Sequence, residues 1–291
     1  MLLVDKPAGP TSHDVVRVVR RALGMKRVGH AGTLDPAATG LLVVLAGRAT
    51  RLARFVAMLP KRYTGSVRFG FETTTDDAEG EPTLRDDGWI ALGQPGARSR
   101  ADLEDALARV ASRTEQVPPP VSAKKVAGER AYRRVRRGED VTLVPAPVSI
   151  HRLTIGDPWD HSGDLPIAVE CSSGTYVRAI ARDLGRTLGT RAHLSALRRS
   201  GIGRWEVREA VPLDSALVET APRSLRPMRE AVAHLPALRV GEAGARLFLH
   251  GRKLESEESH EGFVAVYERE ELLGVAEFRE GLYAPVVGLA S

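Results

Sequence analysis

An unbroken apolar run, Leu41 to Leu45, constrains the fold of this chain more than any other segment. Five consecutive apolar residues between turn signals are typical of a strand that is buried on both faces. A second strand begins near Tyr63, where apolar residues alternate with polar ones up to Phe71. A short strand is also predicted at Leu2 to Val4, and another at Ile167 to Cys171. The sequence therefore predicts a sheet in which the strand at 41–45 lies in the interior of the protein.

Three segments have the apolar spacing of amphipathic helices. The first begins after Thr11 or Ser12 and ends near Leu23, and the second begins at Ser99. The third follows Ser172 or Ser173, either of which could cap it. Residues 49–58 also look helical. Helices and strands alternate irregularly and no segment repeats, which favours an α+β fold with a mixed sheet over a doubly wound parallel one.

Two changes in composition divide the chain. A proline run, residues 117–120, leads into a basic stretch that extends to Arg137, and this predicts an excursion from the body. Residues 236–291 contain short β runs separated by Gly and Glu, and predict a small C-terminal β module. This module has 6 basic and 10 acidic residues.

The basic residues are unevenly distributed. The chain has 42 basic residues, of which 36 are Arg, against 37 acidic ones. Residues 1–75, 113–140 and 171–210 have net charges of +8, +4 and +5, so the remainder carries −12. Codon usage could account for the many arginines but not for this segregation. The pattern favours one electropositive face that binds a polyanion, and three unrelated solvated patches are the alternative.

Several classes of protein are excluded. No apolar stretch is long enough to span a membrane, and the N-terminus lacks the basic region of a secretory signal. The single cysteine, Cys171, rules out an internal disulfide framework. There is no Walker loop or dinucleotide-binding glycine motif, and the eight histidines lack metal-ligand spacing. We therefore expect a cytoplasmic protein without metal or cofactor.

A glycine-punctuated segment, residues 29–36, is the strongest candidate for chemistry. Its two glycines allow close backbone approach, and Pro36 restricts the geometry of Asp35. On spacing alone, a turn in which the Asp35 carboxylate accepts a local hydrogen bond is the favoured interpretation.

The motif series around this segment resembles the TruB family of tRNA pseudouridine synthases. Those enzymes isomerise uridine 55 in the T-loop of tRNA. The matching motifs keep their family order over residues 2–210. They are Asp5-Lys6-Pro7, Gly29-His30-x-Gly32-Thr33-Leu34-Asp35-Pro36, Tyr63-x-Gly65, Ser122-Ala123-x-Lys125, Cys171-Ser172-x-Gly174-Thr175-Tyr176-x-Arg178 and Leu197-Arg198-Arg199.

The resemblance implies a largely antiparallel pseudouridine synthase sheet within residues 1–225. It also implies a thumb-like insertion at about 118–147 and a PUA-like domain at 226–291. Asp35 would be the nucleophile, Arg178 its partner, and Tyr63 the residue that packs on the flipped base and serves proton transfer at C5.

Eight further residues are expected to support the site or to bind RNA. Lys6 would hold the active-site loops, His30 would occupy the space left by the flipped nucleotide, and Leu197 would form an apolar wall. Ser173 stands where a lysine is common, and Arg182 and Arg186 could replace that cation. The full set is Lys6, His30, Thr33, Lys125, Arg130, Tyr176, Arg182 and Leu197.

The expected function is that of a stand-alone enzyme acting on the T-arm of tRNA. We expect a monomer with no obligate protein partner. A guide-RNA-dependent pseudouridine synthase shares the aspartate motif, but the thumb-like insertion and the absence of long basic tails argue against it. A non-catalytic tRNA-binding or folding chaperone is the alternative from another class, and the intact Asp35, Tyr63 and Arg178 set argues against it.

Overall fold

The computed structural model describes residues 1–86, 98–120, 125–126, 129–130, 143–156, 164–255 and 260–289, and for 125–126 and 129–130 it describes the backbone alone. Within these residues one large sheet has the strand order β11-β12-β4-β13-β3-β1-β15, with β2 paired to β3 and β14 to β13. Its strands are β1 (Leu2–Lys6), β2 (Val28–His30), β3 (Thr39–Ala46), β4 (Lys61–Phe69), β11 (Ile150–Ile155), β12 (Asp164–Cys171), β13 (Ala192–Ile202), β14 (Trp205–Glu206) and β15 (Val211–Pro212).

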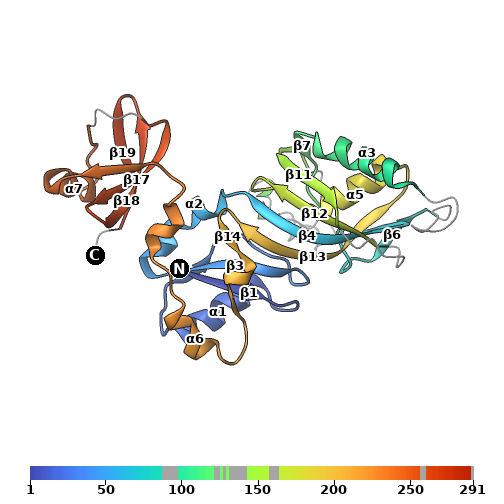
Figure 1. Ribbon diagram of the computed structural model, residues 1–291, viewed down its shortest axis with the longest axis horizontal. Coiled ribbons are helices and arrows are strands. Elements are labelled where there is room, and N and C mark those ends of the chain that lie inside the picture. Colours follow the sequence, from blue (N-terminus) through green and yellow to red (C-terminus); the bar gives the residue numbers. More distant parts are fainter. Residues whose placement is uncertain are drawn as a thin grey trace.

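The expected mixed, largely antiparallel sheet is confirmed. Only the pairs β1–β15 and β13–β3 are parallel among the described strands of this sheet. Figure 1 shows two groups of helices on it, one over β4, β12 and β13 and the other beside β1 and β3. The helices are α1 (Ser12–Ala22), α2 (Ala53–Ala57), α3 (Arg100–Ala111), α5 (Val177–Thr187) and α6 (Leu217–Arg223), and the 3-10 turns are η1 (Gly47–Leu52), η2 (Val207–Glu209) and η3 (Met228–Val232).

Strand β3 shows why its sequence is apolar throughout. Leu41, Val43 and Leu45 pack into a core with η1 and α2, whereas Leu42 and Val44 pack into a second core with α1 and α6. All five side chains are completely buried. The predicted strand with two buried faces is therefore confirmed.

The helix starts agree with the sequence at α1 and at α3, whose N-cap residue is Ser99, and differ at α5. Thr11 caps α1 by accepting a hydrogen bond from the backbone of Asp14, as the sequence predicted. The expectation that Ser172 or Ser173 caps α5 is wrong, because α5 begins at Val177 after the N-cap residue Tyr176. The Ser172 hydroxyl instead accepts a hydrogen bond from the Ser149 backbone, so it joins two loops.

Three short ladders extend from the large sheet. They are β5 (Phe71–Thr73) with β6 (Pro82–Arg85), β7 (Glu115–Gln116) with β10 (Ala146–Pro147), and β8 (Lys125–Val126) with β9 (Glu129–Arg130). The pair β7–β10 lies at the root of the expected thumb insertion. Most of that insertion, including Val121, falls outside the described residues.

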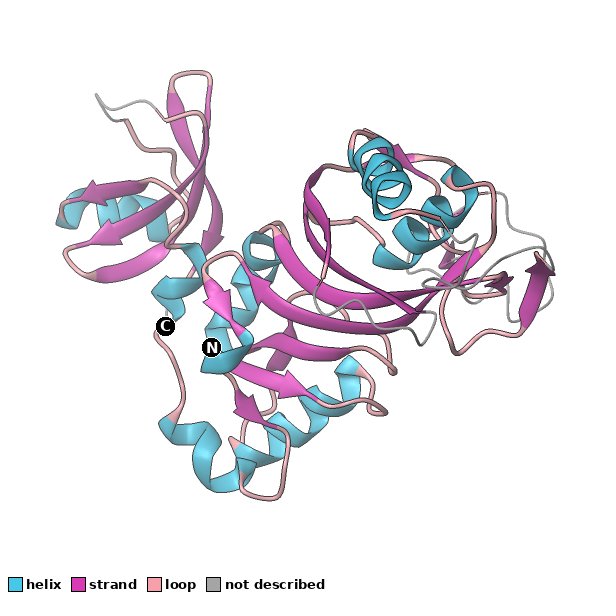
Figure 2. Cartoon of the chain, turned by 45° about the vertical axis from the view of Figure 1, so that its right-hand side comes forward, coloured by secondary structure: helices cyan, strands magenta, loops and turns pink. Residues whose placement is uncertain are grey.

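The C-terminal segment forms a separate four-stranded sheet, seen at the upper left of Figures 1 and 2. It consists of β16 (Ala237–Val240), β17 (Gly262–Glu268), β18 (Glu271–Arg279) and β19 (Leu282–Gly288), with the helix α7 (Glu242–Leu249), which the sequence reading did not anticipate. Phe263 packs edge-on against Phe55 of α2, and Arg48 donates a hydrogen bond to the carbonyl of Leu289. The module is therefore packed directly on the first part of the chain. Of the helices described, none is both long and apolar enough to cross a bilayer.

Candidate active site

The loop between β2 and β3 holds Asp35 in place through its neighbours. The Ser12 hydroxyl donates a hydrogen bond to the carbonyl of Leu34 and accepts one from its amide, at 3.0 and 2.9 Å. The Lys6 ammonium donates to the carbonyl of Pro36 at 3.0 Å. These contacts fix the residues on both sides of Asp35, so its carboxylate is preorganised on a rigid loop.

Two glycines explain why this loop can approach β13 so closely. Gly32 and Gly40 have φ angles of +99° and +102°, which L side chains rarely adopt. At Gly40 a Cβ atom would also lie 2.3 Å from the carbonyl oxygen of Arg199. Of the two glycines that the sequence singled out, Gly32 has a conformation that favours glycine, whereas Gly29 has no positive φ and a Cβ atom there would meet nothing within 4 Å.

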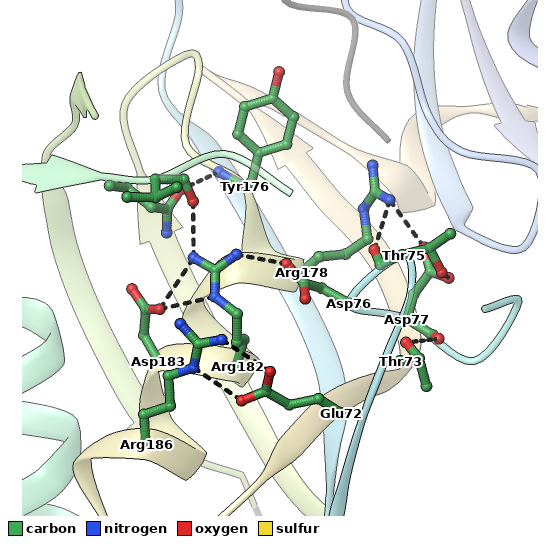
Figure 3. A network of polar contacts seen from close by, with 12 residues as sticks. Glu72, Thr73, Thr75, Asp76, Asp77, Tyr176, Arg178, Arg182, Asp183 and Arg186 are labelled. Carbon is green, nitrogen blue, oxygen red and sulfur yellow. Dashed lines mark hydrogen bonds and ion pairs between the residues drawn. The ribbon is translucent and has the colours of Figure 1, made fainter. Parts of the chain in front are cut away.

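Arg178 in the first turn of α5 links Asp35 to a second carboxylate. Its Nε lies 3.2 Å from Oδ2 of Asp35, and its Nη1 lies 3.1 Å from Oδ2 of Asp77 and 3.0 Å from the carbonyl oxygen of Thr75. Figure 3 shows the Arg178 side chain reaching away from α5 toward Thr75 and Asp77. The Arg178 side chain is 8% exposed and that of Asp35 is 41% exposed, so the arginine is fixed while the carboxylate remains accessible.

An apolar pocket adjoins this ion pair. Leu194, Ala196 and Leu197 of β13 line it, together with Ala38 and Ala78 and with Asp35, Asp77 and Arg178. Its walls are mainly apolar apart from this one charged cluster, a lining that is typical of ligand sites. Leu197 is thus in the position expected of an apolar wall.

Tyr63 lies on β4, in the strand next to Leu197. Its side chain belongs to the core under α3 and α5 and is 8% exposed. Burial raises the pKa of the Tyr63 phenol, and the neighbouring Arg199 guanidinium opposes this rise. The charge of Asp35 raises the pKa of the phenol further.

Lys6 and His30 belong to the support of the loop. The Lys6 side chain is completely buried and donates to the carbonyls of Pro7 and Pro36, so it holds the loop and cannot reach RNA. His30 packs edge-on against His13 at 5.3 Å, and its Nδ1 has no hydrogen-bond partner. Burial lowers the pKa of His30 to about 4, so its imidazole is neutral at physiological pH.

The remaining expected RNA-binding residues have different surroundings. Thr33 is exposed, and its carbonyl accepts a hydrogen bond from Arg199. The backbone amide of Tyr176 donates to Gln116, and its ring points away from the arginine network in Figure 3. The side chains of Lys125 and Arg130 lie outside the described residues, although their backbones pair across β8 and β9.

Arg182 does not have the role that the sequence suggested. It is 5% exposed, and its guanidinium contacts Asp76 at 2.6 Å, Asp183 at 3.1 Å and the carbonyl oxygen of Val117 at 2.8 Å. One turn further along α5, Arg186 makes a bidentate pair with Glu72 at 2.8 Å. Neither arginine is therefore a substitute for the cation that Ser173 lacks.

The same pattern changes the interpretation of the basic block at 171–210. Seven of its eight arginines form ion pairs with carboxylates, and Arg199 is buried among backbone carbonyls. The net charge of this block is thus largely neutralised by acidic residues elsewhere in the chain. Arg178, Arg182 and Arg199 are buried and add nothing to an open electropositive surface. The paired side chains of Arg186, Arg191, Arg198, Arg204 and Arg208 remain 39–81% exposed.

Four residues of the site were not singled out by the sequence. Asp76 and Asp77 lie in the polar run 73–81, which is typical of a loop. The sequence pattern assigns no role to Glu72, and Arg199 is a motif residue without one. One feature of the sequence could have indicated these contacts. Segment 72–77 contains three acidic residues, and α5 has three arginines at four-residue spacing that pair with them.

Comparison with known proteins identifies the family. The model of the TruB family pseudouridylate synthase N-terminal domain matches residues 20–177, and that of the pseudouridine synthase II TruB C-terminal domain matches 236–289. The chain belongs to the TruB family of pseudouridylate synthases. The tRNA pseudouridine synthase B of Thermobifida fusca is 43% identical over 100% of this chain and 98% of its own, and that of Nocardia farcinica is 46% identical over 80% and 74%.

Solved structures agree on the fold. A Cbf5-Nop10-Gar1 complex contains a chain with a TM-score of 0.71 and 22% identity, which covers 95% of this chain and 77% of that one. An H/ACA RNP bound to a substrate RNA containing 2'-deoxyuridine also gives a TM-score of 0.71, with 18% identity over 100% and 84%. The expected pseudouridine synthase fold is therefore confirmed, together with a TruB C-terminal domain.

Proposed function

We propose that this protein is a stand-alone tRNA pseudouridine synthase that converts uridine 55 of the T-loop to pseudouridine, with Asp35 as its nucleophile. The observation that carries the proposal is the contact of Arg178 with Asp35, at 3.2 Å, beside the apolar pocket that contains Leu197. The relatives described above are named tRNA pseudouridine synthase B, which favours tRNA as the substrate.

The reaction breaks the N1–C1′ bond, turns the uracil, and joins C5 to C1′. A carboxylate nucleophile divides this change into easier steps, and Arg178 orients the Asp35 carboxylate through its fixed bonds to Asp77 and Thr75. The pocket around Leu197 would retain the detached base. Tyr63 would pack on this base and take part in the removal of the proton from C5.

Access to the bond requires that the nucleotide be flipped out of the T-loop, at a cost of a few kcal/mol. Thr33, Tyr176, Lys125 and Arg130 are the residues that we propose for RNA contact. We assign residues 1–225 to the catalytic domain, with the thumb insertion at about 118–147, and residues 226–291 to the C-terminal domain.

The test is pseudouridine mapping on a tRNA transcript incubated with the purified protein. A transcript with cytidine at position 55 is the matched control. We expect pseudouridine at position 55 of the first transcript, and the same product on an isolated T-arm without added RNA or protein. Activity only with a guide RNA would favour the guide-dependent class, and tight binding with no product would favour the chaperone.

A further inference from the structure

Three buried cations lie around the Asp35 loop without carboxylate partners. The side chains of Lys6, Lys61 and Arg199 are 0%, 7% and 1% exposed. In the described part of the chain, they donate hydrogen bonds to backbone carbonyls and form no ion pair with a carboxylate. Burial of an unpaired charge is costly. A fold that keeps three of them in one place concentrates positive potential there.

Arg199 lies at the centre of this group. Its Nε donates to the carbonyl of Leu41 at 2.7 Å, and its two terminal nitrogens donate to Gly32 at 3.0 Å and Thr33 at 3.3 Å. Arg199 therefore stabilises the loop on the N-terminal side of Asp35. A Cβ atom on Gly32 would lie within 3.7 Å of Arg199 and 3.8 Å of Lys61, so the two cations share the space beneath the loop.

Arg199 also faces Tyr63. The two residues are directly opposite each other on the antiparallel strands β13 and β4. The charge of Arg199 and a side-chain hydrogen bond both act on the Tyr63 phenol. A guanidinium has donors only, so the phenol oxygen is the acceptor.

The other charged or titratable groups that act on Tyr63 do not favour its ionisation. Asp35 and Cys171 both raise the pKa of the phenol, as burial does. Burial raises the pKa of Cys171 itself to about 11, so it is a neutral thiol. Lys61 interacts electrostatically with Arg199 and Cys171, and burial lowers the pKa of the Lys61 ammonium to about 8. Arg199 is thus the group that stabilises negative charge on the Tyr63 oxygen.

We propose that Arg199 is a positioning residue for the removal of the C5 proton, in which it serves as the counter-charge of a Tyr63 phenolate and aligns the phenolate oxygen with the Asp35 loop. This inference rests on the proposed function. In the step, the C5–H bond breaks and its electron pair forms the C5–C6 double bond, while the π electrons of the C6=N1 bond move to N1, which takes a proton from water. The Tyr63 oxygen gains the proton that leaves C5. The phenol returns that proton to water before the next turnover.

The experiment measures single-turnover formation of pseudouridine in full-length tRNA that carries hydrogen or deuterium at C5 of uridine. In Arg199→Gln we expect the rate to fall by about 10²-fold or more, within the range for a general base. We also expect a larger deuterium isotope effect than in the wild type, because C5 deprotonation becomes slower than the other steps. Arg199→Lys keeps a charge near Tyr63 and should give an intermediate rate and isotope effect.

Lys61→Met is the matched control, because it removes a buried cation of the same group that does not act on Tyr63. It should lower thermal stability without changing the isotope effect. If Arg199→Gln is not folded, Arg199→Lys carries the test. An isotope effect that stays at the wild-type value while the rate falls would overturn the role of Arg199. Failure of the wild-type protein to form any pseudouridine would instead overturn the proposed function.

Discussion

Two successive turns of α5 present the same residue type to different surroundings. Arg178 in the first turn is shared between Asp35, which is 41% exposed, and Asp77, which is 14% exposed. Four residues later, Arg182 has a buried partner of its own in Asp76, at 2.6 Å. Only the first arginine contacts an accessible carboxylate. Equal spacing on one helix face therefore yields a pair with an accessible carboxylate at the proposed active site and a buried structural pair, and the carboxylates of the opposite loop decide which is formed.

The substitution Arg182→Met breaks the buried ion pair between Arg182 and Asp76. Loss of one partner leaves the Asp76 carboxylate buried and unpaired, and we expect the free energy of unfolding to fall by about 3–5 kcal/mol. Chemical denaturation of the purified variant measures this. The pseudouridine rate of the remaining folded protein should stay near that of the wild type.

A second substitution sharpens this test. Asp76 has a φ of +59°, a left-handed conformation that Asn tolerates better than most residues. Asp76→Asn in the Arg182→Met background removes the unpaired charge, so it should restore part of the lost stability. No recovery would mean that the lost stability does not come from an uncompensated charge.

Arg178→Lys tests the pair that we propose to be catalytic. A lysine cannot bridge Asp35, Asp77 and the Thr75 carbonyl at once, because it lacks the planar fork. We expect the single-turnover rate to fall by about 10²–10³-fold, as for the loss of one preorganised donor, with little change in the melting temperature. If the rate changed less than in Arg182→Met, the division of labour along α5 would be wrong.

The smallest effect is expected at Glu72, which pairs with Arg186 and Arg191. Although burial opposes it, the hydrogen bond and charge of Arg186 lower the pKa of Glu72. This stabilisation is present above the ordinary pKa of 4.5 and is lost as pH falls through the lower folded value. Glu72→Gln should therefore make the loss of stability on acidification shallower, as measured by unfolding at pH 7 and below pH 4.5. A curve parallel to the wild type would contradict the pairing.

The sequence was informative wherever short-range patterns decide the structure. The strand β3 follows from five apolar residues, and the start of α1 follows from Thr11. Gly32, one of the two glycines singled out before Asp35, has a φ angle that favours glycine. These features depend on residues close together in the chain, so a local pattern can reveal them.

The partners of the α5 arginines could not be predicted in the same way. Arg182 and Asp76 are 106 residues apart, and their contact depends on how the segment after β5 packs on α5. A polar run such as 73–81 is typical of a solvated loop, and nothing local distinguishes a buried aspartate from an exposed one. Arg198 and Arg199 make the same point, because the first pairs with Asp5 and its neighbour is buried.

The measurement that tests the account most directly is tritium release from C5-labelled uridine in tRNA by the Asp35→Asn variant. Asparagine keeps the shape of the side chain but not the nucleophilic carboxylate. The account predicts no release above background, with tRNA binding and melting temperature close to those of the wild type. Release at a rate near that of the wild type would show that Asp35 is not the nucleophile.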